Sequence, residues 1–132
     1  MAEHIAILKK PYLDLIIAGK KTIESRLTKT ALPPYRRVGA GDLIYFKQSS
    51  GPFRATAVVE RVRFYDDLSP GVVDEIRMAF GEVICGDDEY WQMKRNSRYG
   101  TLLWLKNVRE MDREIAFGKL QGRAWFLLSD GK

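Results

Sequence analysis

The residues best suited to chemistry are Lys21, Glu24 and Arg26, which follow closely after Gly19. Residues two apart on a strand point to the same side, about 6.6 Å apart, so Glu24 and Arg26 can pair with each other or face a common ligand. A guanidinium suits phosphate or a base edge, a carboxylate accepts from an exocyclic amine, and a lysine adds a mobile positive charge. These groups favour recognition of a nucleotide, and the alternative is a surface ion pair of little energetic weight.

A second basic group lies later in the chain, where Lys94, Arg95 and Arg98 are interleaved with aromatic residues, Tyr90, Trp91 and Tyr99. Cations interleaved with rings grip phosphates and stack bases in single-stranded nucleic acids. The alternative is that Tyr90 and Trp91 are core contacts of a helix. In that case only a basic rim remains, which we still expect to lie near a ligand cleft.

Other candidate catalytic residues are few. His4 is the single histidine, and its place close to the chain start predicts a mobile side chain and a poor general base. Cys85 is the single cysteine, so an internal disulfide and a soft-ligand zinc site are excluded. We therefore expect neither a metal nor a cofactor.

Length and composition predict one domain over residues 1–132, because a single core is typically built from about 100 to 150 residues. Hydrophobic residues at 45% and charged residues at 30% are globular proportions. The longest apolar runs are too short to cross a bilayer, so we expect a cytoplasmic protein with no membrane partner. The net charge of +5 favours a polyanionic partner, and the oligomeric state is left open.

The elements that position these residues are short. Strands are expected at Ile5–Leu8, Thr22–Thr28, Leu43–Phe46, Arg54–Tyr65, Leu102–Val108 and Arg123–Leu128, and helices beginning at Pro11, Pro70 and the residue after Asp87. Gly19 is suited to the left-handed stop after the first helix. The segment 31–41 has the glycine and proline content of a loop.

The longest expected strand must bend. Its apolar residues up to Val59 share one face, whereas Val62 and Phe64 fall on the other. A bulge near Glu60 and Arg61 would keep both sets in the core. Bent strands with scattered short helices predict an α+β fold whose sheet curls into a partly closed β-barrel with short flanking helices.

The spacing of Gly19, Lys21, Glu24 and Arg26 matches the G-x-K-x-x-E-x-R signature of the ASCH domain family. Further runs resemble bacterial ASCH proteins in the same order, namely Lys10–Tyr12, Ile44–Ser49, Ala57–Tyr65, Tyr99–Leu105 and Gly122–Trp125. The resemblance covers nearly the whole chain. It implies a PUA-like β-barrel, a fold related to modules that bind RNA.

The resemblance also implies a role for the signature. Its three polar residues would line a basic cleft beside the barrel and bind RNA or a modified nucleotide, while Gly19 supplies the turn that directs Lys21 inward. In similar proteins a hairpin loop approaches the signature, which places Ser49 and Ser50 across the cleft. An ordinary polar turn explains the two serines equally well.

A hydrolase is the alternative function. One bacterial ASCH-like type removes the acetyl group from N4-acetylcytidine with a Lys, a Thr and a Glu, and a ribonuclease activity has been associated with the family. In this chain Lys21 matches the lysine, but Glu24 stands where that type has threonine. If the protein is an amidohydrolase or ribonuclease, Lys21 and Glu24 would be its catalytic residues. Asp74 or Glu75 could supply the partner carboxylate, although a solvated helix face explains both.

Overall fold

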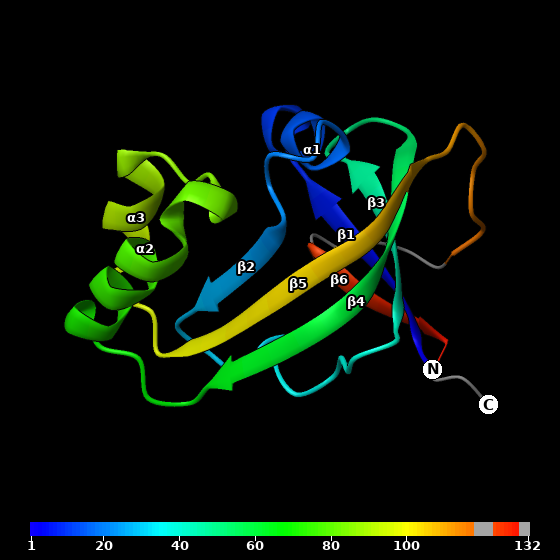
Figure 1. Cartoon of the computed structure of the whole chain (residues 1–132). Helices are drawn as coiled ribbons and strands as arrows, with labels where there is room; N and C mark the ends of the chain where they lie inside the picture. The colour runs from blue at the N-terminus through cyan, green and yellow to red at the C-terminus, as the bar shows by residue number, and fades with distance from the viewer. Residues whose placement is uncertain (118–122, 130–132) are drawn as a thin grey trace.

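The computed structural model describes residues 1–117 and 123–129. The elements are, in chain order, β1 (Glu3–Leu8), α1 (Lys10–Ile17), β2 (Ile23–Thr28), β3 (Leu43–Gln48), β4 (Phe53–Tyr65), α2 (Pro70–Ile84), α3 (Asp88–Lys94), β5 (Tyr99–Glu110) and β6 (Trp125–Ser129). The strands form one six-stranded sheet in the order β2-β5-β4-β3-β1-β6. This sheet curls into a half-barrel flanked by the helices (Figure 1), which confirms the predicted α+β fold.

The two longest strands, β4 and β5, produce the curvature. They pair antiparallel along most of their length, and the register shifts between Val59 and Arg61, where the sequence predicts a bulge. An extra residue on one strand bends that strand and moves the following side chains to the other face. Val62 and Phe64 therefore pack on the same core as Val59. Strand β5 is longer than expected, because its pairing with β4 continues into the polar residues at both ends.

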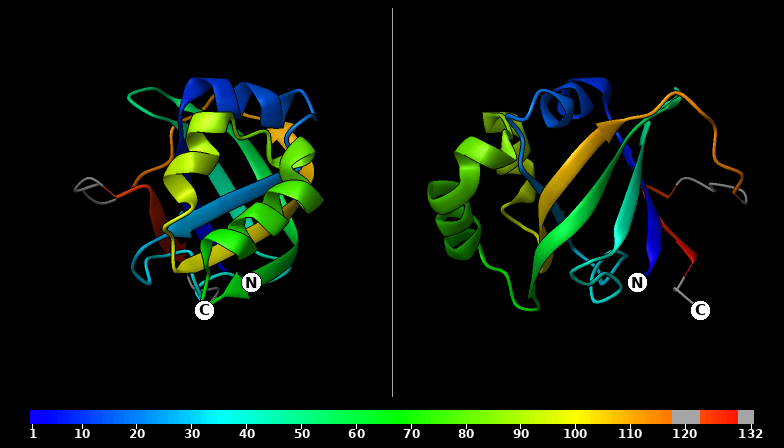
Figure 2. Two further views of the ribbon diagram at one scale, coloured as in Figure 1. Left: turned by 90° about the vertical axis from the view of Figure 1, so that its left-hand side faces the viewer. Right: turned by 45° about the vertical axis from the view of Figure 1, so that its right-hand side comes forward.

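The helices begin and end at the predicted signals. Ser69 accepts a hydrogen bond from the backbone N–H of Val72 at the start of α2, and Asp87 accepts one from Tyr90 at the start of α3. Gly19 follows α1 with φ of 78°. In Figure 2, α2 and α3 lie together at one end of the sheet, whereas α1 lies across the top of the curled sheet in both views. Within residues 1–117 and 123–129, no helix combines the length and the apolar content needed to span a membrane.

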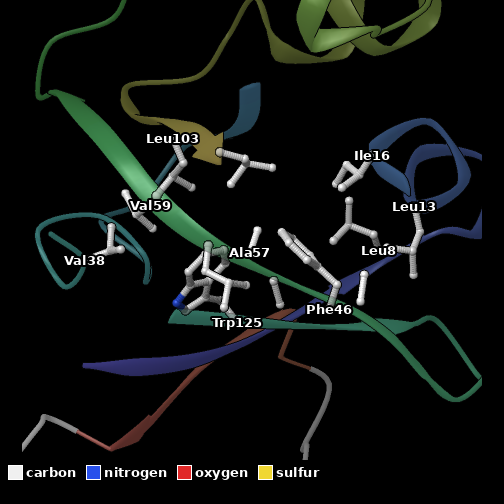
Figure 3. Packing of buried hydrophobic residues seen from close by; sticks show 13 residues of the cluster. Leu8, Leu13, Ile16, Val38, Phe46, Ala57, Val59, Leu103 and Trp125 are labelled. Carbon is white, nitrogen blue, oxygen red and sulfur yellow. The ribbon is translucent and has the colours of Figure 1, made fainter. Parts of the chain in front are cut away.

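Two hydrophobic clusters fix the helices on the sheet. The first fills the concave side of the half-barrel, where Phe46 and Leu103 meet Leu13 and Ile16 of α1 (Figure 3). The second joins α2 and α3 to β2 and β5. The side chains on both faces of strand β2 are largely buried.

The prediction of a mobile His4 is wrong, because this side chain is fully buried in β1. Its Nε2 lies 2.8 Å from an Asp42 carboxylate oxygen, and its Nδ1 accepts a hydrogen bond of 3.1 Å from Trp125. The indole N–H is a donor only, so His4 is neutral with its proton on Nε2. Pairing of β1 with both β3 and β6 buries this histidine despite its position near the chain start.

Candidate functional site

The turn between α1 and β2 directs Lys21 into the molecule. After Gly19 reverses the chain, the backbone N–H of Lys21 donates to the carbonyl oxygen of Leu15. The next N–H, that of Thr22, donates to Val83 of α2. This double attachment leaves the Lys21 side chain pointing between α2 and the start of β2.

The Lys21 ammonium is held at this position by its contacts. The prediction that Lys21 supplies a mobile positive charge is therefore wrong. The side chain is only 3% exposed. Its Nζ donates to the carbonyl oxygens of Ile84 at 2.7 Å and Ile23 at 3.0 Å, and it lies 3.2 Å from Glu24 Oε1. The ammonium thus donates to two backbone carbonyl oxygens and is also paired with the Glu24 carboxylate.

Glu24 lies at the centre of the signature residues. Arg26 donates to its Oε2 from Nε at 3.2 Å and from Nη2 at 2.9 Å, and the backbone N–H of Ser25 donates to its Oε1. Burial of this carboxyl opposes its ionisation, but the adjacent charges of Lys21 and Arg26 outweigh burial and hold the pKa of Glu24 below its ordinary value. Glu24 is therefore an ionised carboxylate whose acceptor sites are occupied.

Arg26 connects β2 to the far side of the sheet. Its Nη2 donates to the carbonyl oxygen of Ile7 at 3.1 Å, and its Nη1 donates to that of Ala124 at 3.3 Å. The guanidinium also lies over the Trp125 ring, 5.3 Å from the ring centroid. Of its five N–H groups, four have acceptors among the described residues, which leaves one on Nη1 for a ligand.

These three side chains face a cavity of about 440 Å³ between β1, β2, α1 and α3. Tyr12 of α1 and Tyr90 of α3 form one aromatic side of this cavity, with their ring centroids 6.3 Å apart and their planes tilted by 60°. Lys94 lies at the end of α3, with its Nζ 5.6 Å from the centroid of the Tyr90 ring. The volume is within the range of small-molecule sites, about 300 to 1,000 Å³.

Burial changes the ionisation of two side chains in the cavity wall. It raises the pKa of Tyr90, whose hydroxyl lies 2.5 Å from Ser25 Oγ, so the phenol stays protonated. It also lowers the pKa of Lys94, and repulsion by Arg26 lowers it further. An anion next to Lys94 would reverse this effect by stabilising the ammonium form.

Several other predicted site residues lie outside the cavity. Ser49 and Ser50 are exposed in a tight turn between β3 and β4, which is closed by a hydrogen bond from Gly51 N–H to Gln48. Neither serine lines the cavity, although the backbone N–H of Ser49 donates to Leu8, which does. Arg98 is exposed before β5, with its guanidinium near the Tyr99 ring.

The two carboxylates proposed for a hydrolase are also absent from the cavity lining. Asp74 and Glu75 are exposed on α2, and Asp74 pairs with Arg95. Their helix turns its apolar side to the sheet, so these residues face outward as the amphipathic pattern indicates.

Sequence reasoning missed Tyr12. The signal for Tyr12 is its place directly after Pro11, in the first turn of α1, next to the signature in space. Tyr90 was considered both as a stacking ring and as a core contact; its ring lines the cavity and its hydroxyl lies 2.5 Å from Ser25 Oγ. In the part of the chain that the structure describes, no group of three or more His, Cys, Asp or Glu side chains is arranged to hold a metal ion.

Comparisons with known proteins agree with this architecture. The family model described as the ASCH domain matches residues 7–119. Crystal structures of two mutants of the ASCH protein from Zymomonas mobilis are similar to this chain. One has a TM-score of 0.72 and 18% sequence identity, and the match covers 98% of this chain and 89% of that chain. The other has a TM-score of 0.71 and 16% sequence identity, and the match covers 98% of this chain and 92% of that chain. The N-terminal domain of McrB from Staphylothermus marinus has a TM-score of 0.60 and 17% identity over 97% of this chain and 88% of that chain. No curated protein matches the chain. Because the family model spans most of its length, the protein belongs to the ASCH domain family.

Proposed function

We propose that this ASCH domain binds RNA or a modified nucleotide, with one nucleobase in the cavity between α1, α3 and β2. The observation that carries the proposal is an aromatic side formed by Tyr12 and Tyr90 next to the signature residues, whose charges are paired with one another. The face of an aromatic ring can stack on a planar base without regard to its identity. A nucleobase would therefore bind mainly through its faces.

The signature residues at the base of the cavity leave one N–H group free to form a hydrogen bond with the edge of a nucleobase. Lys21 and Glu24 are used within the protein, whereas Arg26 retains one N–H on Nη1. A guanidinium N–H pairs with a carbonyl oxygen of a base, and this contact favours a base that carries such an acceptor. Lys94 at the edge of the cavity supplies a charge for the phosphate.

Hydrolysis of N4-acetylcytidine-like nucleosides or of RNA is the competing function. It would require Lys21 to abstract a proton or to donate to the reacting carbonyl. Its Nζ already donates to two carbonyl oxygens and is paired with Glu24, which favours a fixed structural cation over a proton carrier. The geometry thus supports binding better than turnover.

The test is the affinity for labelled single-stranded RNA and for mononucleotides, measured by fluorescence anisotropy and by competition. Tyr12→Leu removes a stacking ring and is expected to weaken binding about fivefold or more, since a stacked base contributes about 1–3 kcal/mol. Lys94→Gln is expected to weaken RNA binding and its salt dependence together. Lys106→Gln changes an exposed lysine of β5 away from the cavity and is the matched control.

A second measurement separates binding from catalysis. The wild-type protein is incubated with N4-acetylcytidine and with short RNA, and the mixtures are analysed for products by chromatography. Binding without product supports the proposal. Product formation by the wild-type protein that is lost in Lys21→Met would show that the protein is a hydrolase and would contradict the proposed binding function. Absence of both binding and turnover would reject both functions.

A further inference from the structure

We propose that the cavity continues into a second subsite, so that the ligand is a strand of at least two nucleotides and not a free nucleoside. This inference rests on the proposed function and names the class of ligand. A second hollow of about 470 Å³ adjoins the first, and four residues line both: Leu27, Thr28, Met93 and Lys94. The two hollows therefore form one groove along the edge strand β2, between that strand and the end of α3.

The charges along the groove predict the path that a bound strand takes through it. Helix α3 begins at the cavity with Asp87 and Glu89 and ends at Lys94, about 10 Å away at 1.5 Å per residue. A phosphate is repelled from the acidic end and attracted to the lysine. A strand whose base occupies the first cavity thus leaves it past Lys94, which is where the second hollow opens.

Two lysines on this path lack a partner. Lys94 lines both hollows and Lys29 lines the second, and among residues 1–117 and 123–129 neither has a carboxylate within ion-pair distance. Lys94 lies where the phosphate between two nucleotides would pass. Lys29, which is exposed, lies where the next phosphate would follow.

Exposed apolar side chains supply a surface for the second nucleoside. Leu32 is 53% exposed and Met93 is 64% exposed, and both line the second hollow. Large exposed apolar side chains grouped at a hollow are typical of ligand sites. A base and its ribose can cover them, while the two lysines neutralise the backbone on either side. Charge and shape together select a single-stranded polyanion.

The experiment compares competitors that carry one phosphate each. A mixed pool of nucleoside 5′-monophosphates and a mixed pool of dinucleoside monophosphates compete with labelled short RNA for the full chain. The dinucleoside monophosphates are expected to bind about fivefold tighter or more, because the second nucleoside covers the apolar surface. Equal affinities of the two pools would overturn the second subsite.

Two variants test the same subsite without touching the first. Lys29→Gln is expected to weaken binding of short RNA about threefold and to reduce the slope of log K against log salt by about 0.7. Leu32→Ser is expected to remove the advantage of the dinucleoside monophosphates. Both should leave mononucleotide affinity unchanged, and Lys106→Gln again serves as the control.

The outcomes separate the two proposals. If mononucleotides bind but Lys29→Gln and Leu32→Ser behave like the control, the second subsite is wrong and the proposed function stands. If neither nucleotides nor RNA bind the wild-type protein, both are wrong. Circular dichroism of each variant establishes that the fold is retained, and both changed residues are exposed, so their substitution leaves the core intact.

Discussion

At the scale of single residues, the signature forms a closed network of charges. Glu24 accepts from Lys21, Arg26 and the backbone of Ser25, while the two cations also reach backbone carbonyl oxygens. Buried charges are tolerated when each is paired and hydrogen-bonded. The network therefore shapes the cavity floor and leaves few of its polar atoms to a ligand.

Removal of the central charge should be costly. Glu24→Gln puts an amide N–H₂ among donors and leaves Lys21, which is 3% exposed, without its counter-charge. Loss of one partner from a buried pair typically costs about 3–5 kcal/mol, and we expect that decrease in the free energy of unfolding by urea titration. Asp74→Asn breaks the exposed pair with Arg95 and is the control, for which a much smaller loss is expected. Equal losses in the two variants would contradict a buried network.

The same carboxylate predicts a dependence of stability on acid. The pKa of Glu24 is lowered in the folded protein from an ordinary value of 4.5, so in acid the unfolded chain binds the proton first. Its contribution to stability is complete above that ordinary value and is lost as the pH falls through the folded pKa. The free energy of unfolding, measured against pH, should fall more steeply in wild type than in Glu24→Gln. Parallel curves would show that Glu24 is not ionised in the fold.

At the scale of elements, a buried polar contact holds the two strands at one edge of the sheet. His4 of β1 joins Trp125 of β6 to Asp42, which precedes β3. Asp42 also accepts from the backbone N–H groups of Ala2 and Gly39. Burial opposes the ionisation of Asp42, but these hydrogen bonds hold its pKa below the ordinary value. Strand β6 is thereby fixed next to Arg26, whose guanidinium lies over Trp125.

Trp125→Phe tests this contact. The change removes the indole N–H and leaves His4 Nδ1 without a donor in the core, at a cost of about 1–3 kcal/mol. Trp104→Phe is the matched control, because Trp104 is half-buried and its indole N–H has no acceptor among the described residues. Urea titration should show the larger loss in Trp125→Phe. A larger loss in the control would mean that ring volume, and not the hydrogen bond, matters.

At the scale of the whole molecule, the net charge of +5 is distributed so that much of it is paired or distant from the cavity. Among the described residues, Lys9, Lys94 and the free N–H of Arg26 face a ligand there, and Lys29 extends the groove. Electrostatic attraction to RNA should therefore be modest, and contacts with the base should matter more than the composition suggests.

The salt dependence of RNA binding measures how many of these charges contact phosphates. Each phosphate contact with a single strand contributes a slope of about −0.7 to log K against log salt. Two contacts, at Lys94 and Lys29, predict a slope of about −1.4 for short RNA by anisotropy titration. A slope several times steeper would show that the exposed arginines outside the groove, such as Arg61 and Arg63, carry most of the binding.

The sequence by itself determined the family, the helix signals and the bend in β4. Each of these depends on local chemistry: a glycine stop at Gly19, a cap at Asp87 and a phase change after Val59. Lys21, Glu24 and Arg26, which are close together in the sequence, line one cavity. These features could be read in advance because the residues that specify them are close together in the chain.

Only the tertiary structure decided which polar groups of the signature remain free to bind a ligand. The signature residues donate to backbone carbonyl oxygens from distant parts of the chain, those of Ile84, Ala124 and Ile7. A sequence pattern does not show which backbone groups will accept these hydrogen bonds. The burial of His4 likewise depends on strands that meet only after folding. A side chain's type is local, but whether its hydrogen-bonding capacity is already used is a property of the packed molecule, because burial removes water as the alternative partner.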